Sequence, residues 1–299
     1  MRADRASITA AWVAACRGLA GLLPPGERIC DDPWGLRFGG AGAEAIGLAA
    51  RLTPHTTWRW FRAIRPAALS LYWVQLRTRE IDELLLDFVG RGGVQVVLLG
   101  AGYDARAERL RDRLPSIAIF EVDHPATQAR KRRVLREAGF RGEEPRYVAW
   151  DFERDPMGRL APRLAAGGLD ASRPTFTIWE GVTMYLTERA IEDGVQAIRA
   201  WSGAGSELAF EYFRRSSITE RPVFERLVAN AIVLRDEPFR FGWEPSELPG
   251  WLAARGFDLV RDWSDLDIAR ARLPREHQGG FEAARGGWEF HLALARLRG

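Results

Sequence analysis

The sequence has little cysteine, histidine or lysine. Its two cysteines, Cys16 and Cys30, cannot form a disulfide framework and lack the CxxC spacing of zinc and redox sites. The four histidines lie far apart, and no HExxH or DxDxDG pattern occurs, so we predict no metal site. Lys131 is the only lysine among 43 basic residues, an excess of arginine that codon usage in a GC-rich genome explains.

A marked excess of one charge is also absent. The 43 basic residues are interleaved with 40 acidic ones, which leaves a formal net charge of +3. Only residues 130–133 form a basic cluster, and at helical spacing we expect a solvated helix face there. Without a long basic tract or a nucleic-acid motif, we expect no nucleic-acid partner.

No apolar segment approaches the roughly 20 residues that a membrane-spanning helix needs. The apolar stretch 8–15 ends next to Cys16 in a pattern similar to a lipoprotein cleavage box. This stretch is short, contains a tryptophan and continues with apolar residues at helical intervals, so we do not interpret it as an export signal. We therefore expect no membrane partner and a cytoplasmic location.

The 299 residues are 46% hydrophobic, and the glycines and prolines are spread along the chain. This composition is typical of a globular protein with a full-sized core and no low-complexity linker. The first 90 residues have a helical pattern, clearest at 69–88, which breaks at the glycines around residue 92. We predict an N-terminal helical cap over the active site (1–90) and a second region (91–299), packed as one compact unit.

Short apolar runs follow the break and alternate with stretches of helix length. A β-branched run bounded by glycine is typical of a strand buried on both faces of a parallel sheet. Alternation of such strands with helices predicts an α/β fold with a doubly wound, mostly parallel, seven-stranded sheet. The predicted strands are 94–99, 117–122, 147–149, 175–179, 207–212, 257–263 and 288–297.

A glycine-rich loop directly follows the first predicted strand. Gly100 and Gly102 begin a GxGxxA pattern in which the backbone turns sharply and can approach a ligand closely. Asp123 ends the second predicted strand, where a carboxylate can bind ribose hydroxyls. This combination fits both NAD and S-adenosylmethionine.

The later strands separate these two cofactors. Asp123, Asp151 and Glu180 each follow a predicted strand, so three carboxylates are expected at the edge where open α/β sheets bind ligands. They would repel the pyrophosphate of a dinucleotide and attract the ammonium and sulfonium groups of S-adenosylmethionine. An NAD-dependent oxidoreductase and a non-catalytic cofactor-binding protein remain the alternatives.

Several longer motifs carry a family resemblance over nearly the whole chain. They are Arg77–Thr78, Leu99–Arg106, Glu121–Pro125, Asp151–Phe152 and Trp179–Leu186, with Ala14–Arg17 and Cys30–Pro33 upstream. With them the chain resembles the leucine carboxyl methyltransferase family of class I S-adenosylmethionine-dependent methyltransferases, including its bacterial polyketide O-methyltransferase branch. Ala105 departs from the family pattern, which usually has threonine there.

The resemblance implies a Rossmann-like methyltransferase sheet and S-adenosyl-L-methionine as cofactor. It implies that Arg77 and Arg17 bind the carboxylate of the methionine moiety, which suits a guanidinium group. The backbone at Gly100 and Gly102 would pass close to that moiety. The other implied contacts are Glu180 with the ammonium group, Asp123 with the ribose, and Asp151 and Phe152 with the adenine.

The family further implies O-methylation of a small-molecule carboxylate or phenolic hydroxyl, in secondary metabolism. Methyl transfer from a sulfonium needs alignment and no covalent nucleophile, so we assign no catalytic residue. Tyr185 and Tyr212 lie near strand ends and are candidates to orient the acceptor. We expect His124 to line the ribose site. Four N-terminal aromatic residues, Trp58, Trp60, Phe61 and Trp73, are candidates to hold a flat aromatic acceptor. The sequence does not indicate an oligomeric state.

Overall fold

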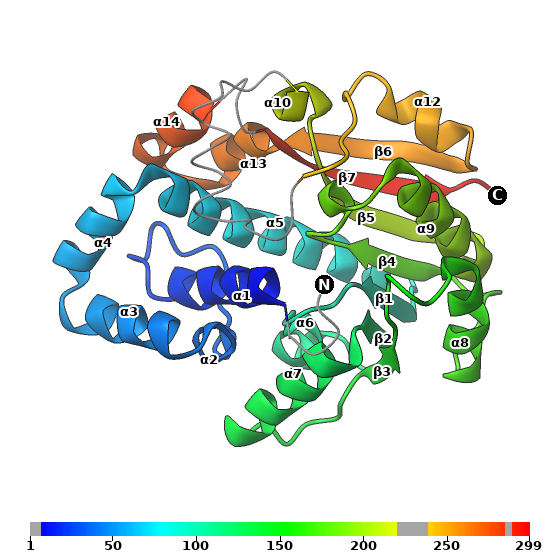
Figure 1. The fold of residues 1–299 in the computed structure, drawn as a ribbon, viewed down its shortest axis with the longest axis horizontal. Coiled ribbons are helices and arrows are strands. Elements are labelled where there is room, and N and C mark those ends of the chain that lie inside the picture. Colours follow the sequence, from blue (N-terminus) through cyan, green and yellow to red (C-terminus); the bar gives the residue numbers. More distant parts are fainter. Residues whose placement is uncertain (1–6, 220–238, 285–288) are drawn as a thin grey trace.

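The fold is a seven-stranded sheet between helical layers, as Figure 1 shows. The computed structural model describes residues 7–219, 239–284 and 289–299. The strands are β1 (Gln95–Leu99), β2 (Ala118–Asp123), β3 (Arg146–Ala149), β4 (Thr175–Trp179), β5 (Glu207–Phe213), β6 (Phe257–Ser264) and β7 (Phe290–Leu297). Their order in the sheet is β3-β2-β1-β4-β5-β7-β6, and all seven predicted strands are confirmed.

Strands β1 to β5 are mutually parallel and end at one edge of the sheet, which we call the carboxyl edge. We call the opposite edge the amino edge. Only β7 runs antiparallel, inserted between β5 and β6. The doubly wound, mostly parallel α/β fold class is therefore confirmed.

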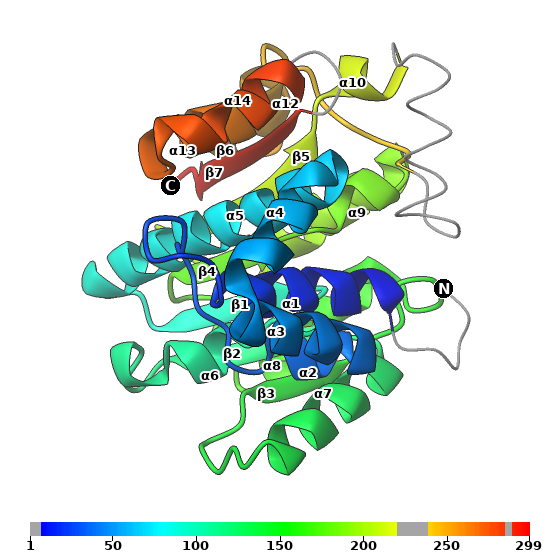
Figure 2. The ribbon, with the colours of Figure 1, turned by 90° about the vertical axis from the view of Figure 1, so that its left-hand side faces the viewer.

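Five helices precede the sheet, within the first 90 residues, where the sequence has a helical pattern. They are α1 (Ile8–Ala20), α2 (Gly35–Gly39), α3 (Ala41–Leu52), α4 (Pro54–Ala63) and α5 (Arg65–Gly90). Figure 2 shows α1 to α4 in front of the sheet, with the long α5 between them and the strands.

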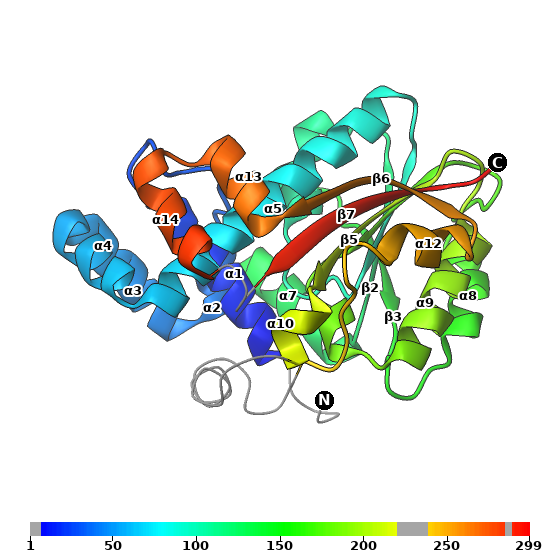
Figure 3. The same cartoon turned by 90° about the horizontal axis from the view of Figure 1, so that it is seen from above.

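The later helices complete the layers. They are α6 (Arg106–Arg109), α7 (Pro125–Glu137), α8 (Leu160–Ala166), α9 (Glu188–Trp201), α10 (Arg215–Thr219), α12 (Leu248–Ala253), α13 (Asp265–Arg272) and α14 (Arg275–Ala284). Seen from above, α8, α9 and α12 lie on the side of the sheet opposite α1 to α4 (Figure 3).

Strand β1 shows why the sequence pattern of the central strands is continuously apolar. Val96 and Leu98 belong to one apolar core, which they share with Leu76 and Leu85 of α5. Val97 and Leu99 point to the other core, on the side of α8 and α9. Because successive side chains of a strand alternate between its faces, a strand covered on both sides needs apolar residues throughout. Helix α5, the last helix of the predicted cap region, therefore shares an apolar core with β1.

The basic cluster at residues 130–133 differs from the prediction. Arg132 and Arg133 are largely exposed on α7, but Lys131 is fully buried. The Lys131 ammonium donates to Glu121 of β2 at 2.6 Å, and it also donates to the carbonyl oxygen of Asp104. The expectation of a solvated face is therefore wrong for Lys131, because this position of α7 points at the sheet.

Candidate active site

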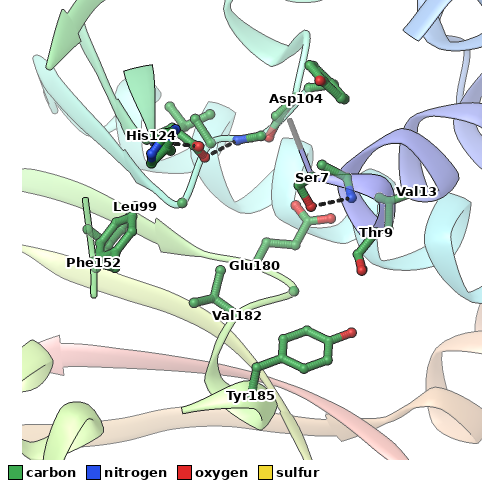
Figure 4. Close-up of a pocket in the computed structure, with 18 of the residues that line it drawn as sticks. Ser7, Thr9, Val13, Leu99, Asp104, His124, Phe152, Glu180, Val182 and Tyr185 are labelled. Carbon is green, nitrogen blue, oxygen red and sulfur yellow. Dashed lines mark hydrogen bonds between the residues drawn. The ribbon is translucent and has the colours of Figure 1, made fainter. Parts of the chain in front are cut away.

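A cavity of about 350 Å³ lies at the carboxyl edge. Its walls come from α1, from the glycine loop after β1, and from the segments that follow β2, β3 and β4. All eight residues predicted to bind the cofactor line this one cavity: Arg17, Arg77, Gly100, Gly102, Asp123, Asp151, Phe152 and Glu180. In Figure 4, Phe152 and His124 lie toward one end of the cavity, and Thr9 and Tyr185 toward the other.

The glycine loop needs its two glycines. Gly100 and Gly102 have φ angles of 75° and 54°, a region that other residues rarely adopt. A Cβ at Gly100 would lie 2.7 Å from Cγ2 of Val182. The loop after β1 can therefore lie this close to the segment after β4 only because Gly100 and Gly102 have no side chain.

Asp123 ties this loop to the end of β2. Its two carboxylate oxygens accept the backbone N–H groups of Gly102 and His124, each at 2.6 Å. Burial raises the pKa of Asp123, and these two donors oppose that rise. The carboxylate thus has a fixed orientation at the wall of the cavity.

Arg77 enters the cavity from α5, between two glutamates. Its Nε donates to Glu180 at 2.9 Å, and one terminal nitrogen donates to Glu211 at 2.5 Å. Burial lowers the pKa of Arg77, but the nearby carboxylates of Glu211 and Glu180 outweigh this effect and raise it overall. The group is a permanent cation.

Arg106 extends this arrangement to α5 and the glycine loop. It donates to Asp82 at 2.7 Å, to Glu180 at 3.1 Å and to Asp104. Burial opposes the ionisation of Asp104, but Arg106 and neighbouring cations lower the pKa of this carboxyl to about 2. The connected group contains three guanidinium groups and four carboxylates, so one negative charge is in excess: Arg77, Arg106 and Arg109 with Asp82, Asp104, Glu180 and Glu211.

Arg17 reaches the same cavity from α1. Its Nε donates to Asp32 at 2.9 Å, and a terminal nitrogen donates to the carbonyl of Tyr103 at 2.6 Å. The two predicted carboxylate-binding arginines are therefore both buried and held by protein acceptors before any ligand binds.

Asp151 and Phe152 follow β3 at the far end of the cavity. The Asp151 carboxylate lies 3.9 Å from Nε2 of His124. Nδ1 of His124 accepts the backbone N–H of Ala126 and so caps α7. This contact places the proton of a neutral ring on Nε2, facing Asp151.

The two predicted acceptor residues differ in position. Tyr185 lines the cavity, and its ring packs against Phe239 with centroids 5.5 Å apart. Tyr212 is fully buried, and its hydroxyl donates to Asp262 at 2.7 Å. Tyr212 does not line the cavity, so that prediction is wrong. Glu211 faces α5 on one side of β5, and the next side chain must therefore face the other side.

The predicted N-terminal aromatic sandwich is also wrong. None of Trp58, Trp60, Phe61 and Trp73 lines the cavity. Helix α4, which carries the first three, contacts α3 and α5, and Figure 1 shows it at the left of the molecule, away from the strands. Trp73 is buried beside the site, where its indole N–H donates to Glu211 at 2.6 Å.

Sequence reasoning missed several residues of the site. Glu211 left one signal, because an acid stands there between two aromatic residues inside an apolar strand. Asp104 lies within the quoted glycine motif but received no role. Thr9 and Val13 of α1, its N-cap residue Ser7, and Arg240 also line the cavity, and no motif indicates this.

Comparison with known proteins gives three findings. The family model for leucine carboxyl methyltransferase matches residues 10–199. A protein of Mycobacteroides abscessus is 34% identical over 288 residues, which cover 92% of this chain and 89% of that protein. A protein of Streptomyces coelicolor is 35% identical over 210 residues, covering 68% of this chain and 65% of its own length. The names of both ascribe S-adenosyl-L-methionine-dependent methyltransferase activity to them.

Three Streptomyces relatives are matched over only 62 to 65% of their own lengths. Among solved structures, geranyl diphosphate C-methyltransferase of Streptomyces coelicolor has a TM-score of 0.48 at 14% identity, covering 76% of this chain and 83% of that one. Within the described residues, no helix combines the length and apolar character needed to cross a bilayer.

Proposed function

Because the chain belongs to the leucine carboxyl methyltransferase family, we propose that it binds S-adenosyl-L-methionine and transfers the methyl group to a small-molecule acceptor. The observation that carries this proposal is the convergence of the family motifs on one cavity. The cofactor supplies a methyl group bound to a sulfonium. Once the methyl group is transferred, the sulfonium becomes a neutral thioether, which is the leaving group.

The charge of the cavity supports this cofactor over NAD. Five carboxylates and three arginines line it: Asp104, Asp123, Asp151, Glu153 and Glu180 with Arg17, Arg77 and Arg240. An excess of negative charge attracts an ammonium and a sulfonium and repels a pyrophosphate. Family membership and this charge together remove the reason to keep an NAD-dependent oxidoreductase as the alternative.

We propose the roles that the family motifs imply, and the position of each residue at the cavity supports them. Arg17 and Arg77 hold the carboxylate of the methionine moiety, and Glu180 holds its ammonium. Asp123 accepts hydrogen bonds from the ribose. Asp151 and Phe152 hold the adenine at the other end. Because protein acceptors already fix both arginines, little conformational freedom is lost on binding, and such positioning is the main contribution that a methyl transfer needs.

The acceptor is a carboxylate or a phenolic hydroxyl of a small molecule in secondary metabolism. Tyr185 marks the acceptor end, and the rings of Phe239, Phe213 and Phe290 stand in contact behind it. These three rings do not line the cavity themselves, and Trp73 stacks on Phe290 in the same layer, so the ring of Tyr185 at the cavity wall is the one that favours an aromatic acceptor. An ionised acceptor needs no general base. His124 fits this chemistry, because the lone pair of Nδ1 is already used as a helix cap.

Calorimetry tests the cofactor, and mass spectrometry tests the transfer. We expect S-adenosylmethionine and S-adenosylhomocysteine to bind and NAD not to bind. With a panel of aromatic carboxylates and phenols, the true acceptor gains the mass of one methyl group. Tight NAD binding would contradict the proposal. Cofactor binding with no transfer to any acceptor would favour the non-catalytic alternative.

A further inference from the structure

Glu211 is a buried carboxylate beneath the cavity that no motif assigns. It lies on β5, is fully buried and does not line the cavity. Its Oε1 accepts the indole N–H of Trp73 at 2.6 Å, and its Oε2 accepts from Arg77 at 2.5 Å and from the backbone N–H of Gly181 at 3.0 Å. A buried ionised carboxylate is strongly unfavourable unless donors surround it, and here three donors do.

These contacts fix the orientation of the Arg77 guanidinium. Its Nε is bound to Glu180 and one terminal nitrogen to Glu211. The second terminal nitrogen makes no hydrogen bond to the part of the chain that the structure describes, and Arg77 lines the cavity. A planar guanidinium held on two sides presents its remaining donors in one direction only.

The same carboxylate fixes the backbone next to Glu180. Gly181 has a φ of 69°, and its N–H is bound to Glu211. Glu180 is the preceding residue, so the position of its side chain depends on this turn. One buried acid therefore orients both the cation and the anion that face the methionine end of the cavity.

We propose that Glu211 is a positioning residue that sets the affinity for the amino-acid end of S-adenosylmethionine, acting through Arg77 and Glu180; this inference rests on the proposed function. It touches no part of the ligand itself. Removal of Glu211 should therefore weaken the binding of ligands that have an amino-acid end and leave unchanged the binding of ligands that lack one.

The test compares two ligands with wild-type protein and the Glu211→Gln variant. S-adenosylhomocysteine has the amino-acid end, and 5′-methylthioadenosine has the same adenosine and thioether without it. We expect Glu211→Gln to weaken S-adenosylhomocysteine by about 10- to 100-fold, the scale of a hydrogen bond to a charged group, and methylthioadenosine by less than about 2-fold.

Glu207→Gln is the matched control. Glu207 is likewise a buried glutamate on the same strand, but it lies at the amino edge and binds two arginines, Arg91 and Arg296. We expect this variant to leave the affinity for both ligands unchanged. In an Arg77→Gln background, adding Glu211→Gln should weaken S-adenosylhomocysteine binding less than it does in the wild-type background, because the route through Arg77 is already lost and only the route through Gly181 and Glu180 remains.

An equal loss for both ligands would show a merely structural role and overturn the proposal, as would unchanged affinities. If Glu211→Gln does not fold, Trp73→Phe removes one of the three donors to Glu211 and keeps an aromatic ring. Trp73→Phe should weaken S-adenosylhomocysteine binding by a smaller factor, and again more than it weakens methylthioadenosine binding. An equal loss of affinity for both ligands would again overturn the proposal. If wild-type protein binds neither ligand, the proposed function itself is wrong.

Discussion

A buried glutamate lies near each end of β5, and the two glutamates differ in their partners. Glu207 and Glu211 are four residues apart on one face of the strand, with exposed fractions of 2% and 0%. At the amino edge, Glu207 binds the side chains of Arg91 and Arg296, which are 43% and 47% exposed. At the carboxyl edge, Glu211 binds Arg77, whose side chain is 6% exposed.

The difference lies in what happens when a pair breaks. A half-exposed arginine can return to water, so its pair with a carboxylate contributes little to stability. A buried guanidinium and its carboxylates cannot be hydrated, so each depends on the other. The comparison teaches that burial of the acid does not by itself mark a functional position. A functional position is marked instead by the burial of the paired cation and by the cavity that this cation faces.

The largest expected difference is in stability. Arg77→Gln should lower the free energy of unfolding by about 3 to 5 kcal/mol, because it leaves buried carboxylates without their cation. Arg91→Gln at the other end should cost about 1 kcal/mol or less. Urea denaturation of both variants measures this contrast. Equal losses would remove the distinction between the two ends of β5.

Cofactor affinity should depend on a carboxylate at the carboxyl edge of the sheet and not on one at the amino edge. Asp123→Ala should weaken binding of S-adenosylmethionine by about 1.5 to 3 kcal/mol, the value for hydrogen bonds to a charged group. Calorimetry measures it, with Asp170→Ala as the control. Asp170 precedes β4 at the amino edge, and its carboxylate binds only Ser172 in its own turn. A folded Asp123→Ala variant with unchanged affinity would disprove the ribose assignment.

A third contrast uses pH at the carboxyl end of β5. His291 pairs with Tyr212 across β5 and β7, and its two ring nitrogens each lie 3.1 Å from a carboxylate, of Asp262 and of Glu289. Burial opposes the charge, but the two carboxylates prevail and raise the pKa of His291 to about 9. Because the folded value is the higher one, the stabilisation is complete below about pH 6.5 and is lost as pH rises through about 9.

Denaturation at several pH values tests this contribution. Wild-type protein should lose about 2 to 3 kcal/mol of stability between about pH 6.5 and about pH 9.5, and His291→Gln should show a flatter profile. His55→Gln, at an exposed position of α4, is the control and should keep the wild-type slope. If His291→Gln kept that slope too, the paired imidazolium would not be its source.

A smaller effect is expected at the acceptor end. Tyr185→Phe keeps the ring that packs on Phe239 and removes the hydroxyl, so transfer should slow by only a few-fold, the effect of one neutral hydrogen bond. Single-turnover rates with bound acceptor measure it. Complete loss of transfer would instead give the Tyr185 hydroxyl an essential part in the chemistry.

The smallest expected effect is none at all. The kcat profile should show no limb near about pH 6.5, where free histidine titrates, because an ionised acceptor needs no base. A rate that rises through that pH, and that loses the rise in His124→Ala with cofactor affinity intact, would make His124 the general base.

The local sequence predicts the strands and the glycine loop, because both depend on neighbouring residues. Val96–Leu99 is apolar on both faces, and the positive φ of the backbone at position 100 favours a glycine there. The motif residues could also be located, since parallel strands bring their carboxyl ends to one edge.

What could not be predicted depends on contacts distant in the sequence. Tyr212 and Glu211 are adjacent, and only the insertion of β7 beside β5 decides that Tyr212 meets Asp262 and His291 while Glu211 meets α5. Trp58, Trp60 and Phe61 have the composition expected of an acceptor site. Their helix, α4, packs against α3 and α5, which composition alone does not indicate.

The burial of Lys131 has a practical consequence. This lysine is the only side-chain amine in the sequence, it is 0% exposed, and carboxylates surround its ammonium. Amine-reactive dyes and cross-linkers should therefore leave the side chains of the folded protein unmodified. The same reagents would label Lys131 once the contact between α7 and β2 opens, so the rate of labelling reports directly on unfolding of this part of the sheet.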